Sequence, residues 1–268
     1  MTSVNTSNTS QPELLQSLES LSTEQSAVLQ EVFSSIQGEG PYIGKRQAFV
    51  RFNVCNLHCA YCDSPPIASG ESCQMYPLNP LLPAQKVPNP VSVEQLLETL
   101  AAYTTETPHH GISLTGGEPL LYAPFLKNLL PKASKLAPIY LETSASLPRK
   151  LADIFDWVSI TAMDIKLPSA TGEPMPLEAH RACYEIASQK EMFIKLVFSE
   201  NTAASELAAV CDIVQDRSTP IILQPMTDLK TGEVQIPVAK MLSLESTLSQ
   251  WFSDVRVIPQ SHRMLKMR

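Results

Sequence analysis

Short hydrophobic runs alternate along the chain with segments whose hydrophobic residues recur at helical spacing. Runs rich in Val, Ile, Leu and Phe predict strands at 47–54, 111–115, 138–142, 157–165, 192–198, 219–224 and 254–258. Helical spacing predicts helices at about 92–103, from Pro119 to about 130, and at 147–155, 177–189, 203–215 and 236–250. Repeated strand–helix units indicate a parallel sheet of six strands with a terminal seventh.

The number of strand–helix units favours an incomplete barrel. A complete eightfold (β/α) barrel typically has about 250 residues. This chain has 268 residues, but they include a polar tail and a proline-rich insertion. We therefore predict an α/β fold, a partial, open (β/α) barrel of about six parallel strands.

Two segments fall outside the strand–helix rhythm. Residues 1–28 begin with a stretch rich in Ser, Thr, Asn and Gln, which predicts a flexible N-terminal extension. Within it, Leu14, Leu18 and Leu21 suit either a short amphipathic helix or poorly ordered chain. Residues 29–268 form the predicted domain, in which the prolines of about 65–91 predict an irregular insertion or lid.

Composition and charge exclude several functional classes. The chain is 44% hydrophobic and 18% charged, as is usual for a soluble globular protein. Its net charge of −7 argues against a nucleic-acid-binding surface. No basic residue precedes Lys45 and no apolar run approaches the roughly 18 residues of a membrane span. Three cysteines are close together and three are scattered, which favours a reducing cytoplasm.

The clustered cysteines, Cys55, Cys59 and Cys62, predict a metal site. Three thiols in one short loop are usually metal ligands. A structural zinc site needs four protein ligands, whereas three thiolates on a four-iron cluster leave one iron open for a bound molecule. The alternatives are a zinc knuckle completed by His58, and a disulfide with a spare thiol.

Polar motifs follow several predicted strands directly. They are Thr115-Gly116-Gly117-Glu118, Glu142-Thr143, Asp164-Ile165-Lys166 and Gln224. Ligands bind at the carboxyl ends of parallel strands, so these motifs and the cysteine loop are predicted to share one rim. Arg51 lies in the strand before the cysteine loop and needs a carboxylate partner, from either a ligand or the protein.

The cysteine spacing resembles that of the radical S-adenosylmethionine (SAM) superfamily. Gly116-Gly117-Glu118-Pro119 resembles its segment for the methionine amine, and Tyr61 occupies its adenine-contacting position. More specific segments resemble the 7-carboxy-7-deazaguanine synthase family. They are Ser35–Gly40, Gly44, Phe49–Arg51, Cys55–Leu57, Cys62–Ser64 and Pro259–His262.

That resemblance implies a partial (β/α) barrel that converts 6-carboxytetrahydropterin to 7-carboxy-7-deazaguanine and releases ammonia. The product feeds the deazapurine nucleosides of modified tRNA. The implied cofactors are a 4Fe-4S cluster, SAM and Mg²⁺. The implied partners are the pterin, a flavodoxin- or ferredoxin-like electron donor and a second copy of the chain, in the cytoplasm.

The resemblance also assigns roles to residues. Cluster ligands would be Cys55, Cys59 and Cys62, and the Mg²⁺ ligand would be Ser64. Substrate contacts would be Ile36, Gln37, Gly38, Arg51 and Thr115, the last two catalytic. Contacts to SAM would be Tyr61, Asp63, Gly116, Gly117, Glu142, Asp164, Ile165, Lys166, Gln224, Pro225, Met226 and Thr227.

The chain departs from the family at a few positions, which keeps alternatives open. Asp164-Ile165-Lys166 stands where many members carry Ser-Pro-Lys, Arg46 stands where Pro is common, and the chain continues past His262 to Arg268. Asp164-Ile165-Lys166 also resembles a motif of glycyl-radical-enzyme activating enzymes, the alternative enzyme class. A zinc-bound interaction module and a member without turnover are the non-catalytic alternatives.

Overall fold

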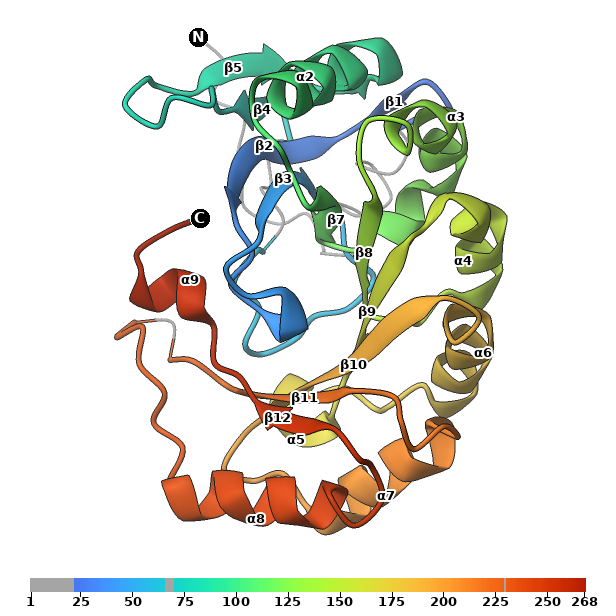
Figure 1. Ribbon diagram of the computed structural model, residues 1–268, viewed down its shortest axis with the longest axis vertical. Coiled ribbons are helices and arrows are strands. Elements are labelled where there is room, and N and C mark those ends of the chain that lie inside the picture. Colours follow the sequence, from blue (N-terminus) through green and yellow to red (C-terminus); the bar gives the residue numbers. More distant parts are fainter. Residues whose placement is uncertain (1–21, 66–69, 229) are drawn as a thin grey trace, which may run out of the picture.

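The computed structural model describes residues 22–65, 70–228 and 230–268 (Figure 1). Its main sheet has ten strands in the order β12-β11-β10-β9-β8-β7-β3-β2-β4-β5. Seven neighbouring strands are parallel: β3 (Arg46–Phe52), β7 (Gly111–Gly116), β8 (Ile139–Thr143), β9 (Ile160–Ile165), β10 (Glu191–Phe198), β11 (Ile221–Pro225) and β12 (Val255–Val257). They are the six predicted strands and the terminal seventh.

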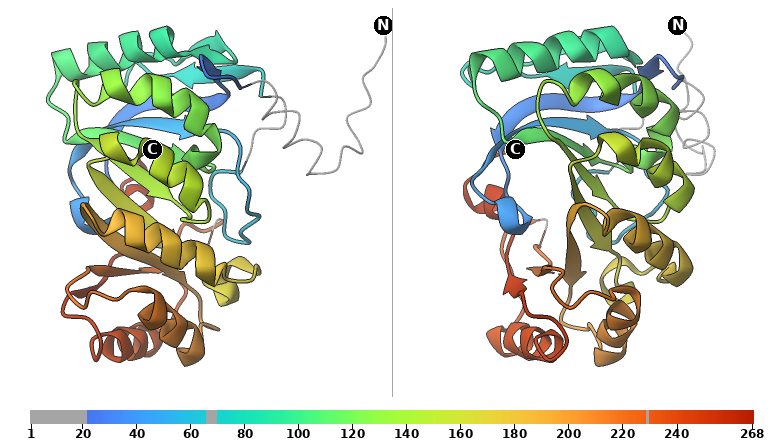
Figure 2. Two further views of the ribbon diagram at one scale, coloured as in Figure 1. Left: turned by 90° about the vertical axis from the view of Figure 1, so that its right-hand side faces the viewer. Right: turned by 45° about the vertical axis from the view of Figure 1, so that its right-hand side comes forward.

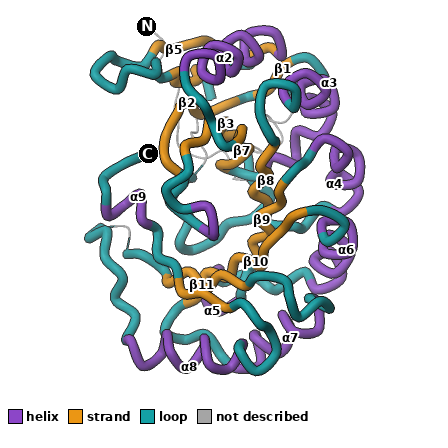
Figure 3. The backbone as a smooth tube through the Cα atoms, in the orientation of Figure 1, coloured by secondary structure: helices purple, strands orange, loops and turns teal. Residues whose placement is uncertain are grey.

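The longer helices follow the predicted alternation and lie along the outer side of the curved sheet (Figures 1, 2 and 3). The longer ones are α2 (Val93–Glu106), α3 (Ala123–Ala133), α4 (Pro148–Ile154), α6 (Leu177–Ala187), α7 (Ala204–Ile213) and α8 (Val238–Leu248). Single turns occur at η1 (Gly40–Tyr42), η2 (Pro119–Tyr122), η3 (Phe155–Trp157), α5 (Pro168–Thr171) and α9 (Ser261–Met264). The sheet order ends at β12 and β5, so this part of the chain forms an open, partial (β/α) barrel, as predicted.

The hydrophobic core lies between the sheet and these helices. Leu96 and Leu100, one helical turn apart on α2, are fully buried. Ser92 accepts a hydrogen bond from the backbone N–H of Gln95 at 3.2 Å and caps this helix, as its position predicts. Every residue of β9 is buried, which is typical of a parallel strand covered on both faces.

The prediction of an irregular insertion at 65–91 is wrong for part of that segment. It contains β4 (Ser72–Met75) and β5 (Gln85–Pro88), which extend the sheet beyond β2 (Leu29–Ile36). Cys73, Met75 and Val87 are buried there. Proline is tolerated on an edge strand because its missing N–H is not needed by a neighbour, so the prolines concealed an edge hairpin.

The predicted N-terminal extension lies mostly outside the described residues, including the helix considered around Leu14, Leu18 and Leu21. Its last part is not an extension, because Ala27 and Val28 are fully buried. β1 (Ser26–Ala27) pairs antiparallel with β6 (Val91–Ser92). Among the described residues, no helix combines the length and the apolar character that crossing a membrane requires.

Candidate active site

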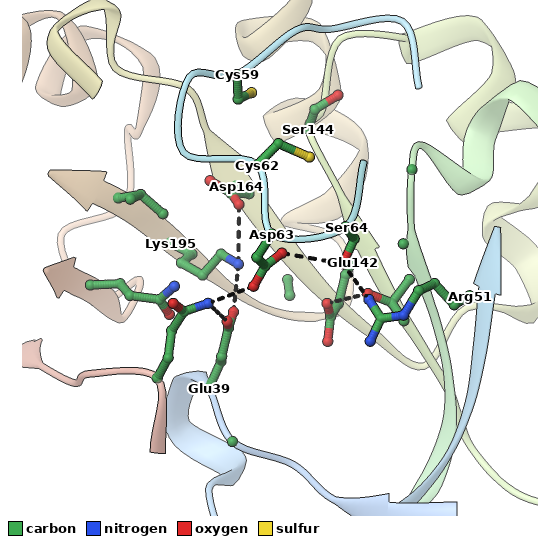
Figure 4. Close-up of a pocket in the computed structure, with 18 of the residues that line it drawn as sticks. Glu39, Arg51, Cys59, Cys62, Asp63, Ser64, Glu142, Ser144, Asp164 and Lys195 are labelled. Atoms are coloured by element: carbon green, nitrogen blue, oxygen red, sulfur yellow. Dashed lines mark hydrogen bonds and ion pairs between the residues drawn. The ribbon is translucent and has the colours of Figure 1, made fainter. Parts of the chain in front are cut away.

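A pocket opens at the carboxyl ends of the parallel strands (Figure 4). It collects most of the predicted site residues, from the turn after β2, from β3 and from the cysteine loop to β11. Four predicted SAM contacts do not line it: Ile165, Pro225, Met226 and Thr227. Ile165 is fully buried in the core.

The three cysteines of the loop after β3 all line the pocket as free thiols. Burial raises the pKa of Cys55 to about 12, with a contribution from the nearby Glu118 carboxylate. Burial also raises the pKa of Cys59. Because metal ligands must be thiolates, metal binding to this loop has to displace protons. His58 points elsewhere, with Nδ1 3.9 Å from Glu173 Oε1, and does not line the pocket.

Glycines hold the end of β7 against the cysteine loop. A Cβ on Gly117 would lie 2.0 Å from the carbonyl oxygen of Val54, so only glycine fits there. The backbone N–H of Glu118 donates to that same carbonyl at 2.8 Å. Gly116 has φ +101°, in the region that favours glycine. The Gly-Gly step therefore fixes the cysteine loop to the sheet.

The Glu118 carboxylate ties the end of β7 to the end of β8. It is fully buried and accepts hydrogen bonds from the Leu120 N–H at 3.0 Å, the Thr143 hydroxyl at 2.8 Å, and the Ser144 N–H and hydroxyl at 2.8 and 2.6 Å. Glu118 itself does not line the pocket. Its contacts make it a framework residue.

On one side of the pocket, charged groups surround Asp164. Asp164 Oδ2 lies 2.8 Å from Lys166 Nζ and 3.1 Å from Lys195 Nζ, and the Lys166 ammonium also donates to the Tyr61 hydroxyl at 3.1 Å. Asp164 Oδ1 and Gln224 Oε1 are buried without a hydrogen-bond partner. Buried acceptors of this kind usually have a partner, so these two can receive donors of a bound ligand.

The other side presents a polar array next to the stacked rings of Phe33 and Phe49, whose centroids lie 4.9 Å apart. Glu142 accepts from the Thr115 hydroxyl at 2.7 Å and from the Gln37 amide at 3.0 Å, which places it with the predicted substrate contacts rather than with the SAM contacts. Arg51 pairs with Glu31 at 2.8 Å and donates to the Ser64 hydroxyl at 2.8 Å. Arg51 therefore has a structural carboxylate partner.

The sequence predictions gave no site role to several lining residues, notably Glu39, Lys195, Gln260 and His262, although all but Lys195 lie in segments that carry the family resemblance. The Gln260 amide donates to Glu39 Oε1 at 2.7 Å and to Asp63 Oδ2 at 3.0 Å. A lysine inside the hydrophobic strand Glu191–Phe198 was a usable signal, because a buried ammonium needs carboxylate partners.

Comparisons with known proteins agree with this geometry. The model of the radical SAM superfamily matches residues 49–173. A 7-carboxy-7-deazaguanine synthase of Geobacter sulfurreducens is 38% identical, covering 89% of this chain and 97% of the relative. One of Archaeoglobus fulgidus is 34% identical, covering 90% and 99%. The crystal structure of QueE from Escherichia coli has a TM-score of 0.52 at 18% identity, covers 92% of this chain and 98% of that one, and supports the fold alone.

The fold and the cysteine loop thus define a radical SAM enzyme, whose cofactors are a 4Fe-4S cluster and SAM. Within that class, the chain belongs to the 7-carboxy-7-deazaguanine synthase family and acts in 7-deazapurine biosynthesis. This membership removes the zinc module and the activating enzyme as alternatives. The residues present fit both cofactors: three thiols in one loop, and two unpartnered buried acceptors in the same pocket.

Proposed function

We propose that this enzyme converts 6-carboxytetrahydropterin to 7-carboxy-7-deazaguanine with release of ammonia. The observation that carries the proposal is the combination of Arg51 with the Gln37–Glu142–Thr115 array in the cysteine-lined pocket. A guanidinium recognises a carboxylate, and an amide with a carboxylate matches the N–H and carbonyl edge of a pterin. Family membership supports the same product.

The two cofactors and the pterin would be bound by different residues of the pocket. Cys55, Cys59 and Cys62 would hold the cluster, and Asp164, Lys166, Tyr61 and Gln224 would bind SAM. When bound and reduced by one electron from a flavodoxin- or ferredoxin-like donor, the cluster and SAM supply radical hydrogen abstraction. Arg51, Thr115, Glu142 and Gln37 would orient the pterin and hold its reacting carbon against the SAM side.

We assign the Mg²⁺ site to the Ser64 hydroxyl. Ser64 Oγ donates to Asp63 Oδ1 at 3.2 Å and accepts from Arg51, so oxygen ligands suited to a hard cation lie beside the carboxylate-binding guanidinium. The ion would orient the substrate carboxylate. We further propose a homodimer in the cytoplasm, where reducing conditions keep the free cysteines as thiols.

An anaerobic assay tests the reaction directly. Reconstituted enzyme, SAM, Mg²⁺ and a reductant are mixed with 6-carboxytetrahydropterin, and the product mass is followed. We expect a 7-carboxy-7-deazaguanine product. Deoxyadenosine without a deazaguanine would contradict the substrate, and binding of both ligands without either product would indicate a member that has lost turnover.

The variant Arg51→Lys tests the role of the guanidinium. Lysine keeps the charge but cannot hold Glu31 and Ser64 while also donating to a ligand carboxylate, so we expect kcat/KM for the pterin to fall roughly tenfold or more. The matched control is Arg181→Lys, which alters an exposed pair with Glu178 at 2.9 Å. Equal kcat/KM values for the two variants would remove Arg51 from substrate binding.

A further inference from the structure

Lys195 lines the pocket although no sequence motif pointed to it. It projects from β10, paired in register with Asp164 of β9, and its side chain is only 12% exposed. Its ammonium lies 3.1 Å from Asp164 Oδ2 and 2.7 Å from Glu39 Oε2 (Figure 4). Burial opposes its charge, yet the two carboxylates outweigh that effect and hold the pKa of Lys195 well above its usual value.

The two carboxylates come from different parts of the sheet: Asp164 from β9 and Glu39 from the turn after β2. Asp164 also pairs with Lys166, which reaches Tyr61 of the cysteine loop, on the side where SAM would bind. Glu39 lies in the turn Gln37–Gly40, whose Gln37 amide contacts Glu142 on the side where the pterin would bind. One ammonium therefore links two segments, and Lys195 itself lies 156 residues from Glu39 in the sequence.

On the SAM side, this chain of contacts ends in an oxygen of Asp164 that can still accept a hydrogen bond. Asp164 Oδ1 is buried and has no hydrogen-bond partner, whereas Oδ2 is shared by two ammonium groups. A donor group of SAM on Oδ1 would hold Asp164 in place, and through Lys195 also Glu39. The turn Gln37–Gly40 packs tightly on the C-terminal segment, since a Cβ on Gly38 would lie 2.5 Å from His262 Nδ1. Holding Glu39 thus helps to fix the position of the substrate-facing turn.

We propose that Lys195 is a positioning residue that couples SAM binding to substrate binding across the Asp164–Lys195–Glu39 bridge. The inference rests on the proposed function, because it places the pterin at the Gln37–Gly40 turn. The first ligand to bind holds the bridge in place, so the second ligand meets a site that is already arranged and binds more tightly. The coupling is reciprocal by thermodynamic necessity.

Calorimetric titration without reductant measures this coupling, because both ligands stay intact. In the wild-type holoenzyme, saturating SAM is expected to tighten pterin binding roughly fivefold or more, and the pterin to tighten SAM binding by the same factor. In Lys195→Met the factor is expected to fall to nearly one. The control Lys127→Met, which breaks an exposed pair with Asp153 at 3.9 Å, keeps the wild-type factor.

A second variant covers the case in which Lys195→Met does not fold, because removing one partner of a buried charge network is destabilising. Glu39→Gln keeps the shape of the side chain and removes only its charge, and it is also expected to lose the coupling. Full coupling in either folded variant would overturn the proposal. So would wild-type enzyme that binds both ligands independently.

Hydrogen exchange separates failure of this inference from failure of the proposed function. If the wild-type enzyme does not bind the pterin, the proposed substrate is wrong, but the bridge is still testable with SAM alone. SAM is then expected to slow exchange of the amides that brace the turn, such as Gly44 N–H on the Gln37 carbonyl at 3.0 Å, in the wild type and not in Lys195→Met. Equal slowing in both proteins would overturn the bridge.

Discussion

Glu118 and Asp164 are two buried carboxylates at the ends of parallel strands, with opposite surroundings. Both oxygens of Glu118 accept hydrogen bonds, and all of its donors are neutral hydroxyl or backbone groups. Asp164 has two charged donors on Oδ2 and none on Oδ1. Asp164 lines the pocket and Glu118 does not.

This difference distinguishes a residue that holds the fold together, Glu118, from one that can bind a ligand, Asp164. A buried carboxylate whose oxygens are all satisfied has no capacity left for a ligand, and its neutral donors belong to the elements that it joins. A buried carboxylate with an open oxygen and ammonium partners on the other oxygen is poised for a ligand donor. Three experiments test whether the two residues differ in this way.

The largest effect is expected from Glu118→Ala. The substitution leaves the Leu120 N–H, the Thr143 hydroxyl and both Ser144 donors buried without an acceptor, so the free energy of unfolding should fall by about 3 kcal/mol or more. Denaturant unfolding of the reconstituted enzyme measures it. Glu118→Gln keeps an acceptor and should lose less, and a loss below about 1 kcal/mol in Glu118→Ala would end the framework interpretation.

The next effect is expected in the pH dependence of stability, which should differ between the surroundings of Glu118 and those of Asp164. His180 is fully buried on the framework side, where Nε2 donates to the Ser144 carbonyl at 3.1 Å. Burial lowers the pKa of His180 from 6.5 to about 4. As the pH falls between these values, the unfolded chain gains a proton that the folded chain does not, so stability is lost, by about 3 kcal/mol in all.

The charged side should respond only at lower pH. Burial acts to raise the pKa of Asp164, but Lys166 and Lys195 outweigh it and hold that pKa below its usual 3.8. Its contribution is therefore present above that value and is lost only as the pH falls below it. The free energy of unfolding, measured from pH 7 to 5, tests whether stability in this range depends on His180. The variant His180→Gln is the reference, because it has no imidazole to titrate. An unchanged slope in that variant would show that His180 is not the cause.

The smallest effect is expected from Asp164→Asn, and it should fall on binding. The amide lacks the charge that strengthens a bond to a SAM donor, so the SAM affinity of the folded variant should fall roughly tenfold. Asp153→Asn, at an exposed pair with Lys127, is the matched control. Wild-type SAM affinity in Asp164→Asn, measured by calorimetry, would remove Asp164 from the cofactor site.

The sequence by itself determined the elements whose signals are local. Parallel strands buried on both faces appear as unbroken apolar runs, and the spacing of Cys55, Cys59 and Cys62 places three thiols in one loop without reference to the rest of the fold. The same locality explains why Gly117 and Glu118 could be recognised as a motif. It also explains why the role of Glu118 could not, since its partners Thr143 and Ser144 come from another strand.

Only the tertiary structure decided which distant residues meet. Strands β4 and β5 were concealed because pairing at a sheet edge depends on a neighbour and not on their own composition. Lys195 meets Glu39 across 156 residues, and Gln260 meets Glu39 across 221. Such contacts leave no periodic signal in the sequence, because they depend on the spatial order of the strands in the sheet. A buried charge in the sequence shows that it has a partner, but not which residue that partner is.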